Sequence, residues 1–326
     1  MATYKALRGL TIRTVDGDAS PLIAGDIWYN SSSKKIKGAK LAPGAWASGG
    51  NLNTARKIGL GAGTQTAALH ASGTPFATIV ESYDGSSWTE GPDLNTHNYH
   101  GGSCGTQTAA IVMGGNKPGP TTHIVTCEKY DGSSWTEVGD LSTGRWAGAT
   151  VGANSSAALY TGGQNAPTPV QDVCESWNDT SWTEVGDLNT GRFAFNGCGT
   201  TTAGITIGGN INPPTDAVDK VETWNGTSWT EATAIPAADY SMGSAGLGTS
   251  TAAFAMGGTT PGPATGGYLW DGSAWAASAA LNTGRPNLRT QAGTSTSAMV
   301  AGNDPAANIT EEWTGEALAA VTFTSS

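Results

Sequence analysis

The fold is decided by the stretch Glu128-Lys129-Tyr130-Asp131-Gly132-Ser133-Ser134-Trp135-Thr136-Glu137-Val138-Gly139-Asp140-Leu141-Ser142-Thr143-Gly144-Arg145, because versions of it recur along almost the whole chain. Self-similarity with a period of about 20–50 residues is typical of repeat architectures, in which every copy is one structural unit. The first aromatic residue of the stretch recurs in steps of 47, 47, 47, 46 and 43 residues, which gives six repeats. These residues are Tyr83, Tyr130, Trp177, Trp224, Trp270 and Trp313, and the first five are followed five residues later by Trp88, Trp135, Trp182, Trp229 and Trp275.

Each repeat predicts four short strands. The first begins at the arginine that ends the stretch, the second is an apolar run ending in Gly-Gly, the third ends at the aromatic residue, and the fourth carries the tryptophan. Asp-Gly or Asn-Gly joins the third strand to the fourth in most copies, and these pairs readily adopt the positive φ angles of a two-residue hairpin turn. The repeat is therefore a four-stranded antiparallel sheet. The joining pairs are Asp84-Gly85, Asp131-Gly132, Asn178-Asp179, Asn225-Gly226 and Asp271-Gly272.

The composition favours an all-β chain and argues against two classes of partner. The 326 residues include 47 glycines and only 13% charged residues, as expected for short strands joined by tight turns. The net charge of −10 argues against nucleic acid, because its binding depends on Lys and Arg that neutralise phosphates. No apolar run approaches the roughly 20 residues that span a bilayer, and the start of the chain lacks a secretory segment, so we expect no membrane insertion.

The order of these motifs resembles the kelch β-propeller family: Gly-Gly, then the aromatic residue, the tryptophan and Leu-x-Thr-Gly-Arg, at a period near 50 residues. The resemblance covers about residues 41–323 and is weakest in the last repeat, where Leu318 takes the place of the tryptophan and Ala301-Gly302 replaces Gly-Gly. It implies a six-bladed propeller of four-stranded blades over residues 41–326.

The two ends of the repeat region suggest how the ring closes. Residues 44–52 match a fourth strand and its exit but precede the first repeat. Placed on the sixth blade, they would remove an open sheet edge. Residues 318–323 compete for the same place or extend beyond it.

Residues 1–40 do not share the period. The run Gly25-Asp26-Ile27-Trp28-Tyr29-Asn30 and the alternating Lys and Ile up to Gly38 predict a small hairpin. This run resembles the GDIWYN-like element of bacteriophage tail-fibre and virion proteins, which lies in an N-terminal attachment region. The resemblance implies attachment to other virion proteins through residues 1–40, with Asp26, Ile27, Trp28 and Tyr29 as contacts. The alternative is a hairpin that only caps the first blade.

One face of the predicted propeller carries loops that differ from repeat to repeat. It also carries the residues that follow the repeated arginine position, and four of these are aromatic. Aromatic rims with amide and hydroxyl neighbours suit sugars, whereas packing between blades is the other interpretation. We expect the repeated Arg56, Arg145, Arg192 and Arg285 to brace neighbouring blades. The candidate binding residues are Tyr99, Trp146, Phe193, Tyr240, Asn116, Lys117, His123, Gln164, Asn165, Asn210, Asn212 and Asp216.

Enzyme chemistry has little support in the sequence. His97 and His100 with Tyr99 form the one local metal-like cluster, and a solvated loop is the favoured interpretation. A glycosidase needs two carboxylates facing one sugar, whereas the repeated glutamates after the tryptophan are expected on the outer surface. No Cys-x-x-Cys pair occurs, so the four cysteines are expected as buried free thiols. We expect no cofactor and no metal.

The sequence therefore predicts a non-enzymatic virion protein, made in the host cytoplasm, whose propeller recognises a host-surface partner, a glycan being one candidate. Self-association is also open. One alternative is a purely structural or decorating virion module. Others are a propeller enzyme that acts on polysaccharide and a cytoplasmic kelch adaptor.

Overall fold

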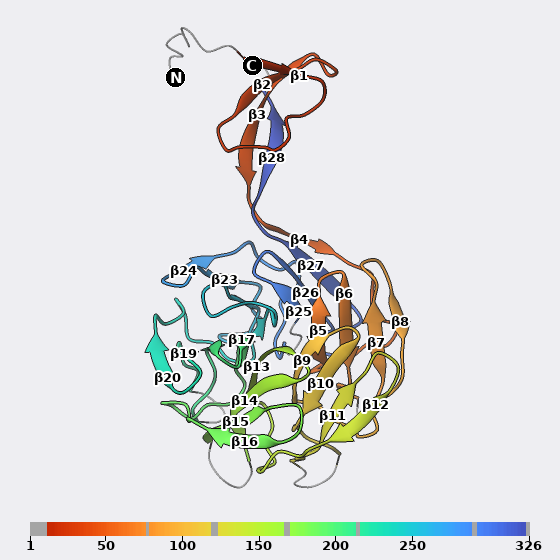
Figure 1. Cartoon of the computed structure of the whole chain (residues 1–326), viewed down its shortest axis with the longest axis vertical. Coiled ribbons are helices and arrows are strands. Elements are labelled where there is room, and N and C mark those ends of the chain that lie inside the picture. The colour runs from red at the N-terminus through yellow and green to blue at the C-terminus, as the bar shows by residue number, and fades with distance from the viewer. Residues whose placement is uncertain are drawn as a thin grey trace. The chain divides into compact units, whose positions relative to one another are not determined.

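The computed structural model describes residues 12–75, 78–118, 123–165, 170–212, 216–288 and 292–323. These residues form seven four-stranded sheets, and among them no helix is long and apolar enough to cross a membrane. The chain divides into two compact units (Figure 1). We call Ala45–Thr314 the propeller unit and Met1–Gly44 with Gly315–Ser326 the terminal unit.

The propeller unit contains six of the sheets, numbered here in chain order. Within each sheet neighbouring strands are antiparallel. In sheets 1 to 5 the chain runs from an inner first strand to an outer fourth strand. Sheet 1 is β5 (Leu60–Thr64), β6 (Ala67–Ala71), β7 (Val80–Tyr83) and β8 (Trp88–Glu90); sheet 2 is β9 (Gly102–Thr106), β10 (Ala109–Met113), β11 (Cys127–Tyr130) and β12 (Trp135–Val138); sheet 3 is β13 (Ala149–Asn154), β14 (Ala157–Gln164), β15 (Val170–Trp177) and β16 (Trp182–Val185). Sheet 4 is β17 (Asn196–Thr200), β18 (Ala203–Ile207), β19 (Val221–Trp224) and β20 (Trp229–Ala232); sheet 5 is β21 (Gly243–Ser244), β22 (Phe254–Met256), β23 (Gly267–Trp270) and β24 (Trp275–Ala277); sheet 6 is β25 (Ala292–Thr294), β26 (Ser297–Ala301), β27 (Thr310–Thr314) and β4 (Ala45–Ser48).

The repeated motif forms the outer hairpin of sheets 1 to 5. Tyr130 and Trp135 lie opposite each other across the hairpin, and their rings stack with centroids 4.9 Å apart. Gly132 has a φ of 95°, which a glycine adopts without strain. The Asp131 carboxylate accepts the backbone N–H groups of Ser133 and Ser134 at 2.8 Å. In this turn the glycine therefore provides the positive φ angle, and the aspartate accepts the backbone N–H groups that the turn leaves free.

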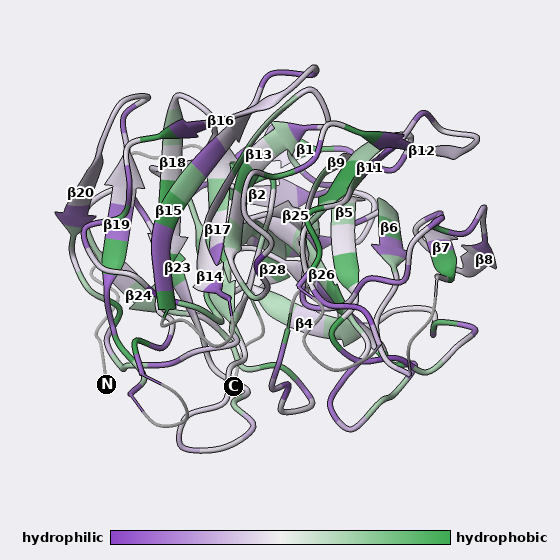
Figure 2. Cartoon of the chain, turned by 90° about the horizontal axis from the view of Figure 1, so that it is seen from below, coloured by the Kyte–Doolittle hydropathy of each residue, from purple (hydrophilic) through white to green (hydrophobic). Residues whose placement is uncertain are grey.

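The hydrophobic core lies between neighbouring sheets. One cluster joins Ile111 and Met113 of sheet 2 to Tyr160 and Trp177 of sheet 3. Figure 2 shows apolar segments within strands such as β5, β13 and β15. Because every sheet buries one face against the preceding sheet, no repeat is stable alone.

The six sheets form a closed ring. The first strands of consecutive sheets contact one another from β5 through β9, β13 and β17 to β21, and β25 contacts β5. Leu247, just after β21, donates its N–H to the carbonyl of Gly293 in β25 at 2.9 Å. This arrangement is that of a β-propeller.

An N-terminal strand completes the last sheet. β4 pairs with β27 in an antiparallel register that places Trp46 opposite Trp313. Residues 317–322 take no part in this sheet, because they pair with β3 instead. The outer strand of sheet 6 is therefore β4, from the predicted segment 44–52, and not the alternative segment 318–323.

The seventh sheet belongs to the terminal unit, where the sequence predicts only a hairpin. It consists of β1 (Arg13–Val15), β2 (Ile27–Asn30), β3 (Lys35–Ala42) and β28 (Ala317–Thr322), with β1 parallel to β2. The chain after Thr314 thus belongs with residues 1–44 and not with the propeller, to which the sequence assigned it. β28 pairs with β3 over six residues. The two strands lie some 280 positions apart in the sequence, and no local pattern predicts their pairing.

The two faces of the terminal sheet differ in their cover. On one face Trp28 is only 1% exposed and packs with Ala19 and Ala39. The pairing register places Ile27, Tyr29, Ile36 and Phe323 on the other face, because residues opposite each other share a face. Ile27 is 43% exposed, Ile36 42% and Phe323 50%. We call this second face the open apolar face.

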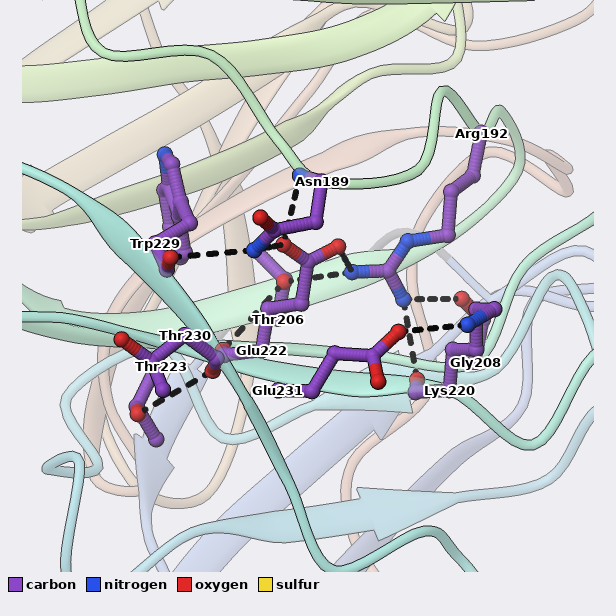
Figure 3. A network of polar contacts seen from close by, with 10 residues as sticks. All are labelled: Asn189, Arg192, Thr206, Gly208, Lys220, Glu222, Thr223, Trp229, Thr230 and Glu231. Atoms are coloured by element: carbon purple, nitrogen blue, oxygen red, sulfur yellow. Dashed lines mark hydrogen bonds and ion pairs between the residues drawn. The ribbon is translucent and has the colours of Figure 1, made fainter.

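A buried ion pair recurs in four sheets of the propeller, and Figure 3 shows the one in sheet 4. The Arg192 guanidinium lies 2.9 Å from the Glu222 carboxylate, and neither side chain is exposed. Arg192 also donates to the carbonyls of Gly208 and Lys220, while Glu222 accepts the N–H of Asn189 at 2.8 Å. These bonds fasten the incoming connection to its new sheet. The other pairs are Arg56–Glu81, Arg145–Glu175 and Arg285–Glu311.

We predict that Glu222→Gln lowers the free energy of unfolding by about 3–5 kcal/mol, because it leaves the Arg192 charge buried without a counter-charge. The control is Lys220→Met, which removes the exposed 2.6 Å ion pair with Glu231 on the same sheet. This control should cost less than about 1 kcal/mol. Urea unfolding of both variants measures the difference, and equal losses would contradict the prediction.

A second prediction concerns His70, which is buried beneath Arg56 with no hydrogen-bond partner at either ring nitrogen in the described structure. Burial, and then the positive charge of Arg56, hold its pKa well below 6.5. Below about pH 6.5 His70 therefore binds a proton in the unfolded chain but not in the folded protein. The free energy of unfolding consequently falls with falling pH, by up to about 1.4 kcal/mol per pH unit. His70→Val, which copies Val300 at the matching position of sheet 6, should reduce this slope between pH 7.5 and 5.5. An unchanged slope would contradict the prediction.

Candidate functional site

The connections of the six sheets divide between two faces of the ring. In an antiparallel sheet the loop after the second strand and the connection after the fourth emerge on the same face. We call this the loop face and the opposite one the turn face. On the loop face, the residue after each repeated arginine position pairs with the residue after Gly-Gly. The observed pairs are Lys57 with Thr74, Tyr99 with Asn116, Trp146 with Gln164, and Phe193 with Asn210.

Backbone hydrogen bonds connect successive sheets at this level. In all six sheets the residue two places after the repeated arginine position has a φ between 55° and 60°. This left-handed conformation costs a residue with a side chain roughly 1–2 kcal/mol, and here it accompanies bonds to the neighbouring sheet. Ala147 donates to the carbonyl of His100 at 2.7 Å, Ala194 to Ala147 at 2.7 Å, Ser241 to Ala194 at 2.6 Å and Leu288 to Ser241 at 3.0 Å. Main-chain hydrogen bonds therefore join neighbouring sheets where the loop face surrounds the axis of the ring. We call this part of the loop face the channel mouth.

Aromatic rings occupy a continuous part of this mouth, which we call the aromatic arc. The His100 ring meets the Trp146 ring edge-on at 5.1 Å, and Trp146 meets Phe193 edge-on at 5.9 Å. Tyr99 lies 5.5 Å from His100, and Tyr240 packs against the cluster around Phe193. All four aromatic residues predicted from the sequence are thus brought together, but they pack on one another. Phe193 is only 8% exposed, whereas the other three are half-buried.

The rest of the mouth is polar. Lys57 of sheet 1 forms a 3.0 Å ion pair with Asp304 of sheet 6, and Asn287 donates to the same carboxylate at 2.8 Å. Asp304 and Asn287 were not among the residues predicted from the sequence. Asp304 follows the Gly-Gly relic of the last repeat, and the rule that selected the other loops would have found it.

The predicted loop residues have unequal exposure. The Asn116 side chain contacts His123 Nδ1 at 2.7 Å, and the His123 ring stacks on Trp146 at 6.5 Å. Asn210 is fully buried, and its side-chain oxygen accepts the N–H of Asn212 at 2.9 Å. Lys117 is exposed, Gln164 and Asn165 are half-buried, and exposed Asn212 donates to Asp216 at 3.2 Å. The proline-rich centres of these loops, residues 119–122, 166–169 and 213–215, lie outside the described residues.

Titratable groups are scattered over the described part of the chain. His97 is exposed while His100 packs within the aromatic arc, and no group of three or more His, Cys, Asp or Glu side chains there is placed to hold a metal ion. Burial lowers the pKa of His123, so its imidazole is neutral at pH 7. The four cysteines are buried and unpaired, and burial raises the pKa of Cys104 to about 12. The arc with its neutral neighbours suits stacking and hydrogen bonding.

The four predicted attachment residues lie in or beside β2, with different exposure. Trp28 belongs to the core of the terminal unit and offers no surface to a partner. Ile27 and Tyr29 lie on the open apolar face, and Asp26 accepts the N–H of Ala39 through its backbone at 2.8 Å. A partner would therefore meet Ile27 and Tyr29, together with Ile36 and Phe323.

Comparison with known proteins bears on the fold. No family model matches the chain, and no curated protein sequence matches it. The chain is similar to a solved structure described as the structure of YjhT, with a TM-score of 0.67 and 14% identity over 82% of this chain and 99% of that chain. At this identity the likeness concerns the fold alone. Together with the closed ring of four-stranded sheets, it identifies an all-β protein of the β-propeller type.

Proposed function

We propose that the protein is a non-enzymatic bacteriophage virion protein with a six-bladed, kelch-type propeller. One sequence repeat corresponds to one sheet of the ring, which supports the blade count and the kelch order of motifs. The terminal unit attaches to other virion proteins, and the loop face of the propeller recognises a host-surface glycan.

The open apolar face of the terminal sheet is the observation that carries this proposal. Only seven large hydrophobic side chains of the described residues are exposed, and six of them lie in the terminal unit. Three of these six, Ile27, Ile36 and Phe323, lie on the open apolar face, whereas the register places Leu41 on the Trp28 face. An exposed apolar surface commonly marks an interaction site. The exposed set is Ile12, Ile23, Ile27, Ile36, Leu41 and Phe323, with Ile211 in the propeller.

The two units also differ in net charge. The terminal unit carries seven Lys and Arg against four Asp and Glu, a net charge of +3, whereas the propeller unit carries nine against 22, a net charge of −13. A unit with a net positive charge suits a partner with an acidic surface. The strongly negative propellers repel one another, which keeps neighbouring copies apart.

The glycan assignment rests on the channel mouth. The aromatic arc offers ring surface beside the Asn116 and Gln164 side chains, and the acids near it are paired or capped, as Asp304 is by Lys57 and Asn287. Sugar rings stack on aromatic faces and bond to amides, and such contacts need no charge. A neutral glycan therefore fits this mouth better than a charged one.

The attachment half of the proposal predicts the behaviour of a double variant, Ile27→Ser with Ile36→Ser. Because it makes the open apolar face polar, association with purified particles or their structural proteins should fall at least about tenfold. The matched control is Ile211→Ser, an exposed isoleucine of the propeller at 39% exposure, which should associate as the wild type does. Equal association of the double variant and the control would refute attachment through this face.

The recognition half predicts that Trp146→Ala weakens binding of host-envelope polysaccharide by about two- to tenfold, since one stacked ring contributes about 0.5–1.5 kcal/mol. Binding is measured by calorimetry on variants whose unfolding transition is intact. If the full protein binds no polysaccharide and still associates with particles, the propeller is a structural module instead.

A further inference from the structure

A groove on the turn face lies between sheets 2 and 3, away from the aromatic arc. It encloses about 480 Å³ and is lined by Lys129, Thr136 and Val138 of sheet 2 and by Ser155 and Ser156 of sheet 3. This volume falls within the range of about 300–1,000 Å³ that small-ligand sites occupy. The groove does not depend on the proposed function, which concerns the opposite face.

The propeller itself fills this position at two other junctions. In sheets 1 and 2 the turn after the first strand presents a glutamine to the preceding sheet. Gln65 donates its amide N–H to the carbonyl of Trp313 at 2.8 Å, and Gln107 donates to the carbonyl of Tyr83 at 2.5 Å. A carboxamide thus lies between the sheets and donates to the carbonyl of the repeated aromatic residue of the third strand.

Sheet 3 lacks this carboxamide. Ser155 takes the glutamine position, and the end of β13 before it contains an extra residue, seen as a register shift between Val151 and Asn154. The counterpart of the two accepting carbonyls is that of Tyr130, which lines the groove. Lys129 reaches across to form an ion pair with Asp179 of sheet 3 and bounds the groove on one side. The shorter Ser82, Ser176 and Thr223 take the place of Lys129 in sheets 1, 3 and 4.

The charges around the groove are already satisfied. Lys129 is paired with Asp179, and the Asp131 carboxylate accepts bonds from the Ser133 hydroxyl and from the Ser134 N–H at 2.8 Å. These hydrogen bonds, that of the Ser133 side chain first, lower the pKa of Asp131 to about 2. A charged ligand would gain no free counter-charge here, whereas the hydroxyl groups of Thr136 and Ser155 line the groove and can bond a neutral polar ligand. The Ser156 hydroxyl donates to the Asn154 side chain at 3.0 Å and can only accept from a ligand.

We infer that the groove binds a neutral sugar residue that carries an N-acyl group. The amide N–H of the ligand takes the place of the glutamine amide at the Tyr130 carbonyl, and the ligand hydroxyls bond to the serine and threonine hydroxyls. The small apolar surface of Val138 and Ala109 lies against the acyl methyl group.

The test compares two disaccharides on the full-length protein by calorimetry or by NMR titration. N,N′-diacetylchitobiose carries the N-acyl groups, and cellobiose has the same linkage without them. The wild type should bind the first at least about tenfold more tightly than the second, since the amide hydrogen bond is made only by the first.

The decisive variant is Ser155→Gln, which supplies the carboxamide that sheets 1 and 2 already carry. It should fold normally and weaken binding of diacetylchitobiose at least about tenfold, because its own amide occupies the site. The matched control, Thr201→Gln in sheet 4, should bind as the wild type does. Thr136→Val, which removes one hydroxyl and retains the shape, should also weaken binding if Ser155→Gln fails to fold.

Three results would overturn the inference: no saturable binding of diacetylchitobiose at millimolar concentration, equal binding of both disaccharides, or undiminished binding by Ser155→Gln. Binding that Trp146→Ala abolishes and Ser155→Gln leaves intact would place the sugar at the channel mouth. That outcome would reject the groove while supporting the proposed function.

Discussion

The pairing of β4 with β27 is the contact on which the rest of the structure depends. Each sheet of the propeller buries an apolar face against the sheet before it, so an open row of six would expose its first and last faces to water. By completing sheet 6 with residues from the start of the repeat region, the chain joins the two ends of the row. The Arg–Glu pairs then bind the connections to their sheets in four of the six cases. The other two sheets lack such a pair, because Asn98 and Asp239 occupy the arginine position.

The same two chain segments pair a second time in the terminal unit. β3 precedes β4 by two residues and β28 follows β27 by two, and β3 pairs with β28. The terminal sheet therefore contains both ends of the chain's repeat region and is a folded unit with its own small core around Trp28. A partner that binds its open apolar face would hold both segments at once.

Local patterns were sufficient for much of this structure. The Asp-Gly pairs, the alternation of apolar runs with turns and the spare strand at residues 44–52 predicted the hairpins, the sheets and the outer strand of sheet 6, because each depends on contacts within a repeat or on a repeat that is displaced. The seventh sheet escaped prediction, since β1 has three residues, β28 carries no repeat motif, and the pairing of β28 with β3 has no local signal. The aromatic arc was predicted in its members but not in their mutual packing, and the groove at Ser155 emerges only when matching turns are compared in three dimensions.

The proposal that the protein attaches by one unit and recognises by the other is tested most directly by comparing residues 45–314 alone with the full chain. This fragment retains all six sheets of the ring, including β4, and lacks the open apolar face. The account predicts that the fragment folds, retains glycan binding and no longer associates with purified particles. Undiminished association of the fragment would contradict the account, because the propeller itself would then be the docking surface.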